Sequence, residues 1–376
     1  MKRIGAVLGF LALFAASLRA DTFETRYYNG NMSPANEVGP IAGNNSSGQA
    51  TITVVVRRDD GGNIVAGTVH FDIDYNFPAP VVVRGLHIHE GGAGVNGPIR
   101  IDTGITPSAT VAAQGAGNLF RTVEVTGGAA LTALSGLLAN PAGFYVNLHT
   151  TEHTGGLMRD QLQVAAQPNP VVFDNGVVNN ASFAAGTNPV APGSIAAVFG
   201  KYLNSGPAAL FTGFDNNGRL LRALGGTQVT VNGIAAPIFY STFGQLGIQI
   251  PVELAGQTSA TLQVSVGGKT SVSRTIPLAG AAPGLFAANQ AGTGPAAALH
   301  EDGVTPVTAS NPALPNEVVV LFGTGLGATS TPLETGAPST GNPVAAPPAV
   351  TIDGVAVTPE FAGRAPTFVG LDQVNV

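Results

Sequence analysis

The chain has no cysteine and no tryptophan, and only 10% of its 376 residues are charged. Without cysteine there can be no disulfide, no thiol catalysis and no cysteine-ligated zinc. The net charge is −6 and no run of lysine or arginine occurs. Nucleic-acid binding relies on neutralising phosphates with basic side chains, so a nucleic-acid partner is not expected.

Glycine and proline, in contrast, are abundant, with 51 and 27 residues. This composition favours many short strands joined by tight turns and disfavours long helices. Hydrophobic residues make up 44% of the chain, which is ample for burial. A chain of this length is expected to form two or three domains. We predict an all-β protein.

The first twenty residues are typical of a secretory signal peptide. Lys2 and Arg3 precede an apolar run over 4–16, and small residues lead to a predicted cleavage site after Ala20. The alternative, a membrane anchor, is disfavoured because the run is shorter than the roughly 20 residues needed to span a bilayer. No later segment is expected to span a membrane. We predict a bacterial exported protein, located outside the cell, at its surface or in the periplasm.

Histidine is concentrated in two short segments, which hold four of the six histidines of the chain. On a strand, alternate side chains share a face, so His87 and His89 should point the same way, with Ile88 on the opposite side. Imidazole is a ligand for copper, zinc and nickel. We therefore predict a site for copper or zinc whose ligands are His87, His89, His149 and His153.

Three charged residues accompany these histidines. Glu90 and Glu152 are expected to orient imidazole rings from outside the ligand set, and Arg159 is expected near the same site. The alternative is a structural network in which the histidines hydrogen-bond to these carboxylates and to backbone carbonyls. Metal-assisted hydrolysis with a glutamate as acid or base is disfavoured, because no nucleophile or paired carboxylates accompany it. The sequence therefore favours a non-catalytic protein.

The part of the chain that contains these histidines alternates between strands and turns. We predict one helix, over 131–139, where leucines are spaced by three and four. Apolar and alternating runs predict strands at 50–56, 65–73, 81–89, 119–125 and 143–149. This pattern predicts a β-sandwich or a β-barrel.

The same part resembles the CHRD domain, a module named from chordin that also occurs in bacterial secreted proteins. The segments that carry the resemblance, in the expected order, are 33–40, 85–91, 95–98, 145–153, 155–159 and 161–162. The resemblance implies a β-rich extracellular domain, which we place at 21–165. It implies no defined biochemical role.

A fainter resemblance concerns the strand at 85–90, which is similar to the copper-binding strand of Cu/Zn superoxide dismutases. Arg159, which follows two glycines, resembles a later segment of their active site. The chain departs from that family because no histidine lies between His89 and His149, and because it has no disulfide. The resemblance implies a metal site, and the departures argue against dismutase activity.

Beyond a predicted linker at 166–180, three sequence blocks recur in the same order. They are 191–200 with 314–323, 229–237 with 350–358, and 246–250 with 371–374. Such recurrence indicates two copies of one unit. We predict a first repeat with a hairpin extension at 181–312 and an incomplete second repeat at 313–376. Because the second repeat ends within a strand, we expect either that the sequence is truncated or that a partner supplies the last strands.

The half of the chain over about 177–376 resembles the repeat-bearing C-terminal domain of secreted acidobacterial proteins such as those of Solibacter, and each repeat is similar to IPT/TIG-type immunoglobulin-like domains. The resemblance implies an extracellular scaffold without catalytic residues. We therefore expect a secreted binding, adhesion or cell-surface protein whose partner is an extracellular protein or a polysaccharide. The alternative is a histidine-rich copper or zinc domain of superoxide-dismutase-like character for metal storage or redox chemistry. A third possibility is a purely structural surface component.

Overall fold

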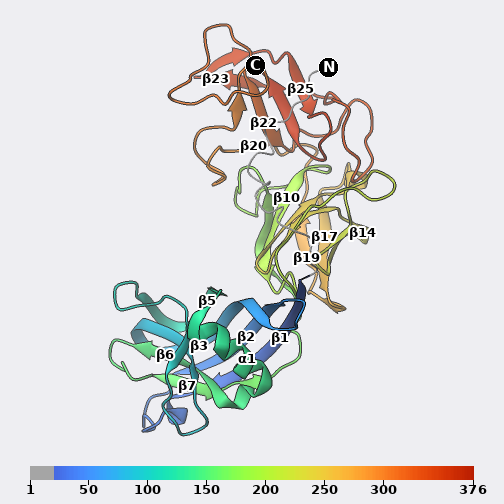
Figure 1. Cartoon of the computed structure of the whole chain (residues 1–376). Helices are drawn as coiled ribbons and strands as arrows, with labels where there is room; N and C mark the ends of the chain where they lie inside the picture. Colours follow the sequence, from blue (N-terminus) through green and yellow to red (C-terminus); the bar gives the residue numbers. More distant parts are fainter. Residues whose placement is uncertain (1–20) are drawn as a thin grey trace. The chain divides into compact units, whose positions relative to one another are not determined.

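The computed structural model describes residues 21–376, so the predicted signal peptide lies outside the described residues. The chain forms two compact units, which meet in sequence between Gln167 and Pro168. We call residues 21–167 the N-terminal unit and residues 168–376 the C-terminal unit (Figure 1). Both units are built almost entirely from strands, which confirms the predicted all-β class. In the described part of the chain, no helix is long and apolar enough to cross a membrane.

The N-terminal unit contains one sheet of eight strands in the order β7-β6-β3-β2-β1-β8, with β4 and β5 also paired to β3. The two ends of this order, β7 and β8, follow each other directly in the chain, so the sheet nearly closes on itself. The strands are β1 (Thr22–Met32), β2 (Ser47–Arg58), β3 (Ile64–Glu90), β4 (Ile99–Asp102), β5 (Val111–Val125), β6 (Phe144–Thr150), β7 (Met158–Gln161) and β8 (Gln163–Val164). Short 3-10 turns lie at η1 (Pro34–Asn36) and η2 (Pro141–Gly143).

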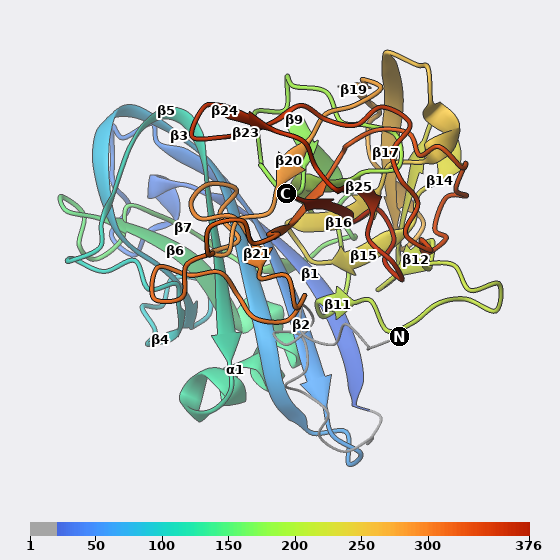
Figure 2. The same cartoon turned by 90° about the horizontal axis from the view of Figure 1, so that it is seen from above.

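The strand β3 is the longest element, with 27 residues, and it joins the two strands predicted at 65–73 and 81–89. Its first half lies between β2 and β5, and its last third pairs with β6 and β4 (Figure 2). The register with β6 shifts between Val83 and Gly85. Odd-numbered residues such as Phe71 are in the core before this shift, whereas Leu86 and Ile88 are in the core after it. The shift therefore turns odd-numbered residues after Val83 away from the core.

The core of the N-terminal unit is closed on one side by α1 (Gly128–Ala139), the only α-helix in residues 21–376. This helix confirms the one predicted from the leucine spacing. Leu134 and Leu137 are fully buried in the core. Leu134 approaches the backbone of β3 so closely that a Cβ on Gly67 would lie 2.7 Å from its Cδ1. A glycine at this position therefore lets the helix pack directly on the strand.

The C-terminal unit has two five-stranded sheets, one six-stranded sheet and one two-stranded sheet. A single 3-10 turn, η3 (Val252–Leu254), precedes β17. The strands are β9 (Val171–Asn179), β10 (Ile195–Lys201), β11 (Ala209–Leu210), β12 (Ala223–Leu224), β13 (Thr227–Val231), β14 (Ile234–Ala235), β15 (Ile238–Ser241), β16 (Gln245–Gln249), β17 (Ser259–Val266), β18 (Lys269–Thr270), β19 (Arg274–Pro277), β20 (Gly284–Leu285), β21 (Ala298–Leu299), β22 (Val320–Thr324), β23 (Val350–Ile352), β24 (Val355–Val357), β25 (Phe361–Arg364) and β26 (Asp372–Asn375).

Strand pairing within the C-terminal unit recurs along with the sequence blocks. The strand β16 lies between β10 and β15, and β26 lies between β22 and β25 in the same antiparallel arrangement. The hairpins β13–β14 and β23–β24 both turn at a residue with a φ of 49°, Asn232 and Asp353, followed by glycine. The first hairpin also pairs with β17, whereas β23 and β24 form a two-stranded sheet.

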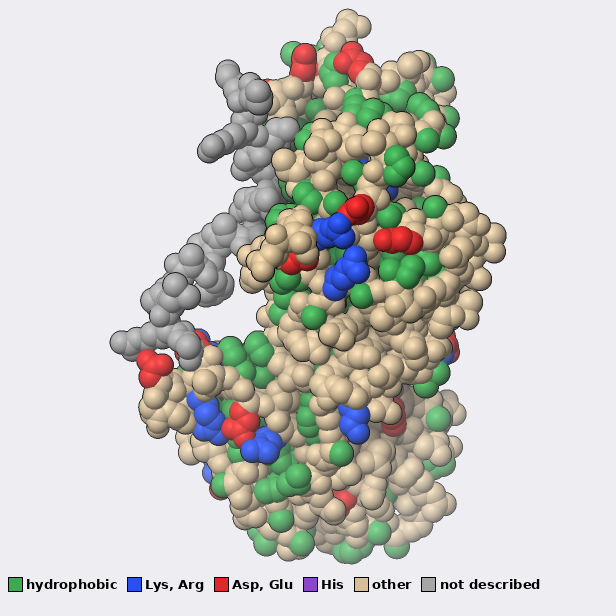
Figure 3. All heavy atoms as spheres, turned by 90° about the vertical axis from the view of Figure 1, so that its right-hand side faces the viewer, with side chains coloured by type: hydrophobic (Ala, Val, Ile, Leu, Met, Phe, Trp, Pro, Cys, Tyr) green, Lys and Arg blue, Asp and Glu red, His purple; other side chains and the backbone are tan. Residues whose placement is uncertain are grey.

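The segment expected to be a linker, 166–180, contains β9. Its valines Val172 and Val177 are buried in the core of the C-terminal unit, together with residues of β10, β13, β16 and β17. This segment therefore forms the edge strand of a five-stranded sheet. Charged side chains are sparse on the face shown in Figure 3 and form small groups of mixed sign.

Candidate metal centre

The histidine segments meet because β3 and β6 are antiparallel neighbours. Their register places Gly85 opposite His149, His87 opposite Asn147, and His89 opposite Tyr145. These side chains share one face of the sheet, since residues directly across an antiparallel pair lie on the same side. The intervening Leu86, Ile88, Val146 and Leu148 are in the hydrophobic core. The strand alternation predicted for His87 and His89 is confirmed.

Three histidines converge on this face. One ring nitrogen each from His87, His89 and His149 lies within 4.8 Å of the others. The ring centroids of His87 and His149 are 4.9 Å apart, and both other pairs are 5.6 Å apart. Each of the three residues is buried, with only 7–8% of its surface exposed to solvent. Among residues 21–376, this is the only group of three or more histidine or acidic residues that could hold a metal ion.

Hydrogen bonds fix which nitrogen two of these rings present. Nδ1 of His89 lies 3.0 Å from the carbonyl oxygen of Gly97, and Nδ1 of His149 lies 3.1 Å from that of Thr154. A carbonyl can only accept, so each Nδ1 carries the proton and each Nε2 has a free lone pair. Both Nε2 atoms are buried without a hydrogen-bond partner. The two rings are therefore oriented as metal ligands usually are.

His87 has the opposite orientation. Its Nε2 lies 3.5 Å from Oδ1 of Asp102, which is its cross-strand neighbour on β4, and its Nδ1 is buried without a partner. Asp102 Oδ1 also accepts from the backbone N–H of Gly104, which fixes the carboxylate. The carboxylate faces one nitrogen of His87 and leaves the other free. Each of the three rings thus presents one unpartnered nitrogen.

Burial keeps the three imidazoles neutral. Desolvation and, to a smaller extent, the neighbouring His87 lower the pKa of His149 to about 4. Desolvation also lowers the pKa of His87, against the opposing effect of Asp102. The pKa of His89 is lowered by the same cause, against the hydrogen bond to Gly97. At neutral pH the lone pairs are therefore available without loss of a proton.

Unpartnered polar atoms are concentrated at this site. Buried side-chain nitrogen and oxygen atoms almost always have hydrogen-bond partners in folded proteins. In the described residues, the exceptions are His87 Nδ1, His89 Nε2, His149 Nε2, Asn147 Oδ1, Glu37 Oε1, Tyr28 OH and Thr53 Oγ1. The first five belong to this one site. Such a concentration of donor and acceptor groups is typical of a binding site.

The side chains of His89, Tyr145 and Arg159 form a stack next to the site. Tyr145 lies parallel to His89, with ring centroids 4.8 Å apart, and the guanidinium carbon of Arg159 lies 3.3 Å from the centre of the Tyr145 ring. Arg159 is 1% exposed and donates hydrogen bonds to the Val95 carbonyl, to Asn96 Oδ1 and to Gln161 Oε1. It therefore fixes the loop after β3, whose carbonyl at Gly97 orients His89. Arg159 acts on the histidines through Tyr145 and this loop.

The other predicted site residues lie apart from the three histidines. His153 is in the turn after β6, where its carbonyl accepts from the backbone of Thr150 and Gly156, and it is not in the histidine group. Glu90 is exposed and pairs with Arg100 at 2.7 Å. Glu152 is exposed in the same turn as His153. Of the four predicted ligands, the structure brings together His87, His89 and His149.

Four residues of the site were not singled out from the sequence. Asn147 and Tyr145 lie two and four residues before His149, so strand alternation places them on its face. Asp102 and Glu37 come from separate elements, and their positions follow from strand pairing that the sequence does not show.

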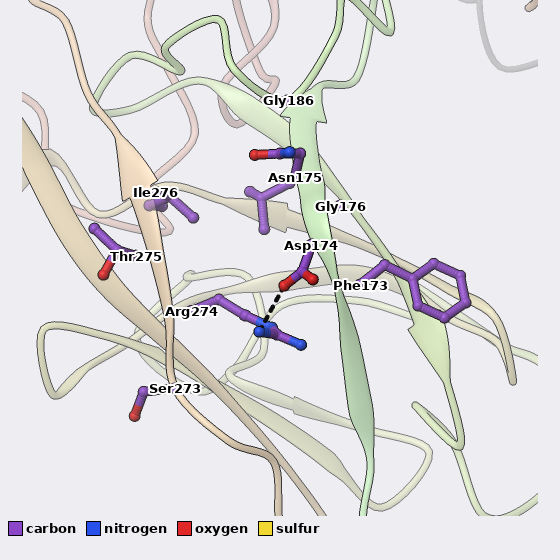
Figure 4. Close-up of a pocket in the computed structure, with 10 residues that line it drawn as sticks. Phe173, Asp174, Asn175, Gly176, Gly186, Ser273, Arg274, Thr275 and Ile276 are labelled. Atoms are coloured by element: carbon purple, nitrogen blue, oxygen red, sulfur yellow. Dashed lines mark ion pairs between the residues drawn. The ribbon is translucent and has the colours of Figure 1, made fainter.

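The C-terminal unit has a cleft of about 470 Å³ between the edge strands β9 and β19 (Figure 4). Arg274 spans it, donating to the Val172 carbonyl at 2.8 Å and pairing with Asp174 at 2.6 Å. The side chain of Asp174 is 83% exposed. This charged pair lies at the surface and is worth little in stability.

Comparison with known proteins supports the resemblance of the N-terminal unit. The family model of the CHRD domain matches residues 28–162, which include all three converging histidines. This confirms the CHRD resemblance for that part of the chain. A search of curated proteins found no match.

Proposed function

We propose that the N-terminal unit binds one transition-metal ion, copper or zinc, through His87, His89 and His149. Two observations carry the proposal: one ring nitrogen from each of the three histidines lies within 4.8 Å of the others, and each ring has one buried nitrogen without a hydrogen-bond partner. A purely structural network would use these nitrogens in hydrogen bonds. Here only the outward nitrogen of each ring faces such a partner.

The donor set suits these metals. Three neutral imidazoles without a thiolate are suited to copper, zinc and nickel, and affinities for divalent ions generally peak at copper. Three protein ligands leave one position of a tetrahedral site open. The carboxylate of Asp102 faces Nε2 of His87 and so acts on the ring from outside the ligand set.

For the whole chain we propose a secreted, non-catalytic binding protein, with residues 1–20 as its signal peptide. In this proposal the C-terminal unit is a scaffold of two immunoglobulin-like repeats that binds an extracellular protein or a polysaccharide. The proposal of two repeats is supported by strand pairing that recurs in β10–β16–β15 and in β22–β26–β25. The cleft between β9 and β19 offers such a partner a concave surface.

Metal content of the full chain, purified without a chelating tag and then dialysed against copper or zinc, tests the metal site. We expect about one ion per chain by mass spectrometry, and loss of that ion in the His87→Ala/His89→Ala double variant. The matched control is His153→Ala, which removes a histidine outside the group and should retain the ion. Retention of the ion by the double variant would show that the site is elsewhere, and absence of metal from the unmodified chain would leave the scaffold role alone.

A further inference from the structure

Two unpartnered oxygen atoms remain at the site after the three histidine nitrogens are assigned to a metal. Oδ1 of Asn147 and Oε1 of Glu37 are buried without a hydrogen-bond partner, and their residues are 2% and 7% exposed. Leaving such a group unsatisfied is unfavourable, and more so if it is charged. Both atoms accept hydrogen bonds, Glu37 Oε1 whenever it is unprotonated. A ligand that satisfies them must therefore donate hydrogen bonds.

Asn147 lies among the histidines. It is directly opposite His87 in the register of β3 and β6, and along β6 it lies between Tyr145 and His149 on the same face. Cross-strand neighbours of this kind have Cβ atoms about 4.5–5.5 Å apart. Its side chain is thus on the face that presents the unpartnered nitrogens.

Glu37 is brought to Asn147 by a tether to β7. The backbones of Ser33 and Arg159 exchange hydrogen bonds at 3.2 and 3.4 Å, and Nδ2 of Asn36 donates to the Arg159 carbonyl at 3.0 Å. Arg159 is in turn the cross-strand neighbour of Asn147. The segment that ends in Glu37 is therefore held beside the strand that flanks Asn147.

Gly156 leaves the space that the two side chains share. A Cβ at this position would lie 2.6 Å from Oε1 of Glu37 and 2.6 Å from Nδ2 of Asn147. Its φ of 135° is also a conformation that favours glycine. Both polar groups therefore converge on one point beside a residue without a side chain.

We propose that Glu37 and Asn147 bind a small hydrogen-bond-donating ligand, water or another small protic molecule, next to the three histidines. This rests on the proposed metal site and assigns the class of ligand that would occupy its open position. A buried water requires two to four polar partners, and these two oxygens supply two of them. The metal would supply a third. Burial also raises the pKa of Glu37 to about 7, against the opposing effects of Arg159 and of a hydrogen bond to Asn147, so near neutral pH both forms of this carboxyl are populated.

The test uses the full chain loaded with copper(II) and exchanged into D₂O, with pulsed electron paramagnetic resonance to detect deuterons near the metal. We expect the unmodified chain to show a strongly coupled deuteron signal in addition to that of the imidazole N–D groups. Asn147→Leu and Glu37→Met, which remove the acceptor oxygens, should lose or strongly reduce the additional signal. Glu37→Gln keeps an acceptor oxygen and should retain it. The control Glu90→Gln alters an exposed carboxylate next to His89 and should change nothing.

Copper content and circular dichroism, measured on each variant, separate the outcomes. If the unmodified chain binds neither copper nor zinc, the metal proposal itself fails. If it binds copper but shows only imidazole deuterons, or if Asn147→Leu and Glu37→Met keep the full signal while folded and loaded, the ligand proposal fails and the metal site stands. The ligand proposal would also fail if protonated Glu37 donates a hydrogen bond directly to Asn147, because the two oxygens would then need no ligand.

Discussion

The ring of His87 occupies the space that a side chain at Gly85 would fill. A Cβ on Gly85 would lie 2.6 Å from Cε1 and 3.2 Å from Nε2 of His87, two residues further along β3. Contacts below 3.0 Å force one of the groups to move, and here the ring has to turn away. The glycine thus determines where the His87 nitrogen lies without itself being a ligand.

Gly85→Ala should therefore weaken metal binding by about tenfold or more while all three ligands remain, as do changes around other metal ligands. The measurement is the dissociation constant for copper or zinc, by competition with a chelator. Gly92→Ala is the control, because a Cβ there would meet nothing within 4 Å. Equal affinities of the two variants would contradict the placement of His87 in the site.

Asp102 should matter to metal affinity through the ring of His87. Asp102→Asn removes the negative charge 3.5 Å from Nε2 of His87. Without this charge, the tautomer of His87 with its proton on Nε2 and a free Nδ1 is less strongly favoured. We expect a loss of roughly 10-fold in affinity, and a changed visible spectrum of the copper form. Glu152→Gln, at an exposed turn position, is the comparison and should leave both unchanged. A spectrum of Asp102→Asn identical to that of the unmodified chain would rule out this role.

Acid should destabilise the metal-free N-terminal unit. Burial lowers the pKa of His149 and of His70 to about 4, below the usual value of 6.5. Between pH 6.5 and 4 the unfolded chain therefore binds more protons than the folded one, so stability is present above this window and is lost as the pH falls through it. Each residue contributes up to roughly 3 kcal/mol. Glu37 has the opposite effect, because burial raises its pKa to about 7. Its contribution to folding stability is present below pH 4.5 and is lost as the pH rises to 7.

Calorimetric scans at several pH values measure this effect, and His149→Gln and His70→Gln should each reduce the slope with pH. A melting temperature of the N-terminal unit that is constant between pH 6.5 and 4 would contradict it. Metal binding should persist to a lower pH than expected for exposed imidazoles, because protons compete only near the lowered pKa values.

Arg364 and Asp372 form a buried ion pair in the C-terminal unit, with side chains 5% and 0% exposed. Asp372 also accepts from the Leu326 backbone N–H, and Arg364 donates to the Gly327 carbonyl. Asp372→Asn leaves a buried guanidinium without its counter-charge, which should cost about 3–5 kcal/mol. Thermal unfolding of the C-terminal unit should shift accordingly, with metal content unchanged. The control is Arg219→Gln, which removes the ion-pair partner of the exposed Glu334 and should change the unfolding temperature little.

Arg159 should be essential for the order of the loop after β3. Arg159→Met keeps the volume over the Tyr145 ring but removes the hydrogen bonds to Val95, Asn96 and Gln161. We expect the free energy of unfolding of the N-terminal unit to fall by about 2–5 kcal/mol, because buried acceptor oxygens lose a charged donor. Hydrogen exchange should become faster in the loop at 91–98, whereas exchange of β13 and β17 should not change. Unaltered exchange in that loop would show that Arg159 serves another purpose.

The strands of the N-terminal unit were predictable because their side chains alternate with a period of two. The segments at 50–56 and 119–125 lie within β2 and β5, and the segment at 143–149 matches β6 except for Gly143, which belongs to η2. The segments at 65–73 and 81–89 were also correct as strands, but they are one continuous β3 with register shifts between its parts. Such shifts depend on the pairing strands, so a local pattern cannot show them.

The sequence by itself determined the all-β class, the common face of His87 and His89, and the absence of thiol ligands. These follow from composition and from strand geometry, which are local properties. Only the tertiary structure decided which histidines meet. The antiparallel register of β3 and β6 brings His149 to the pair, while the turn after β6 holds His153 elsewhere. It also brought Asp102, Asn147 and Glu37 to the site, because long-range pairing and tethering set their positions, and no local spacing encodes either.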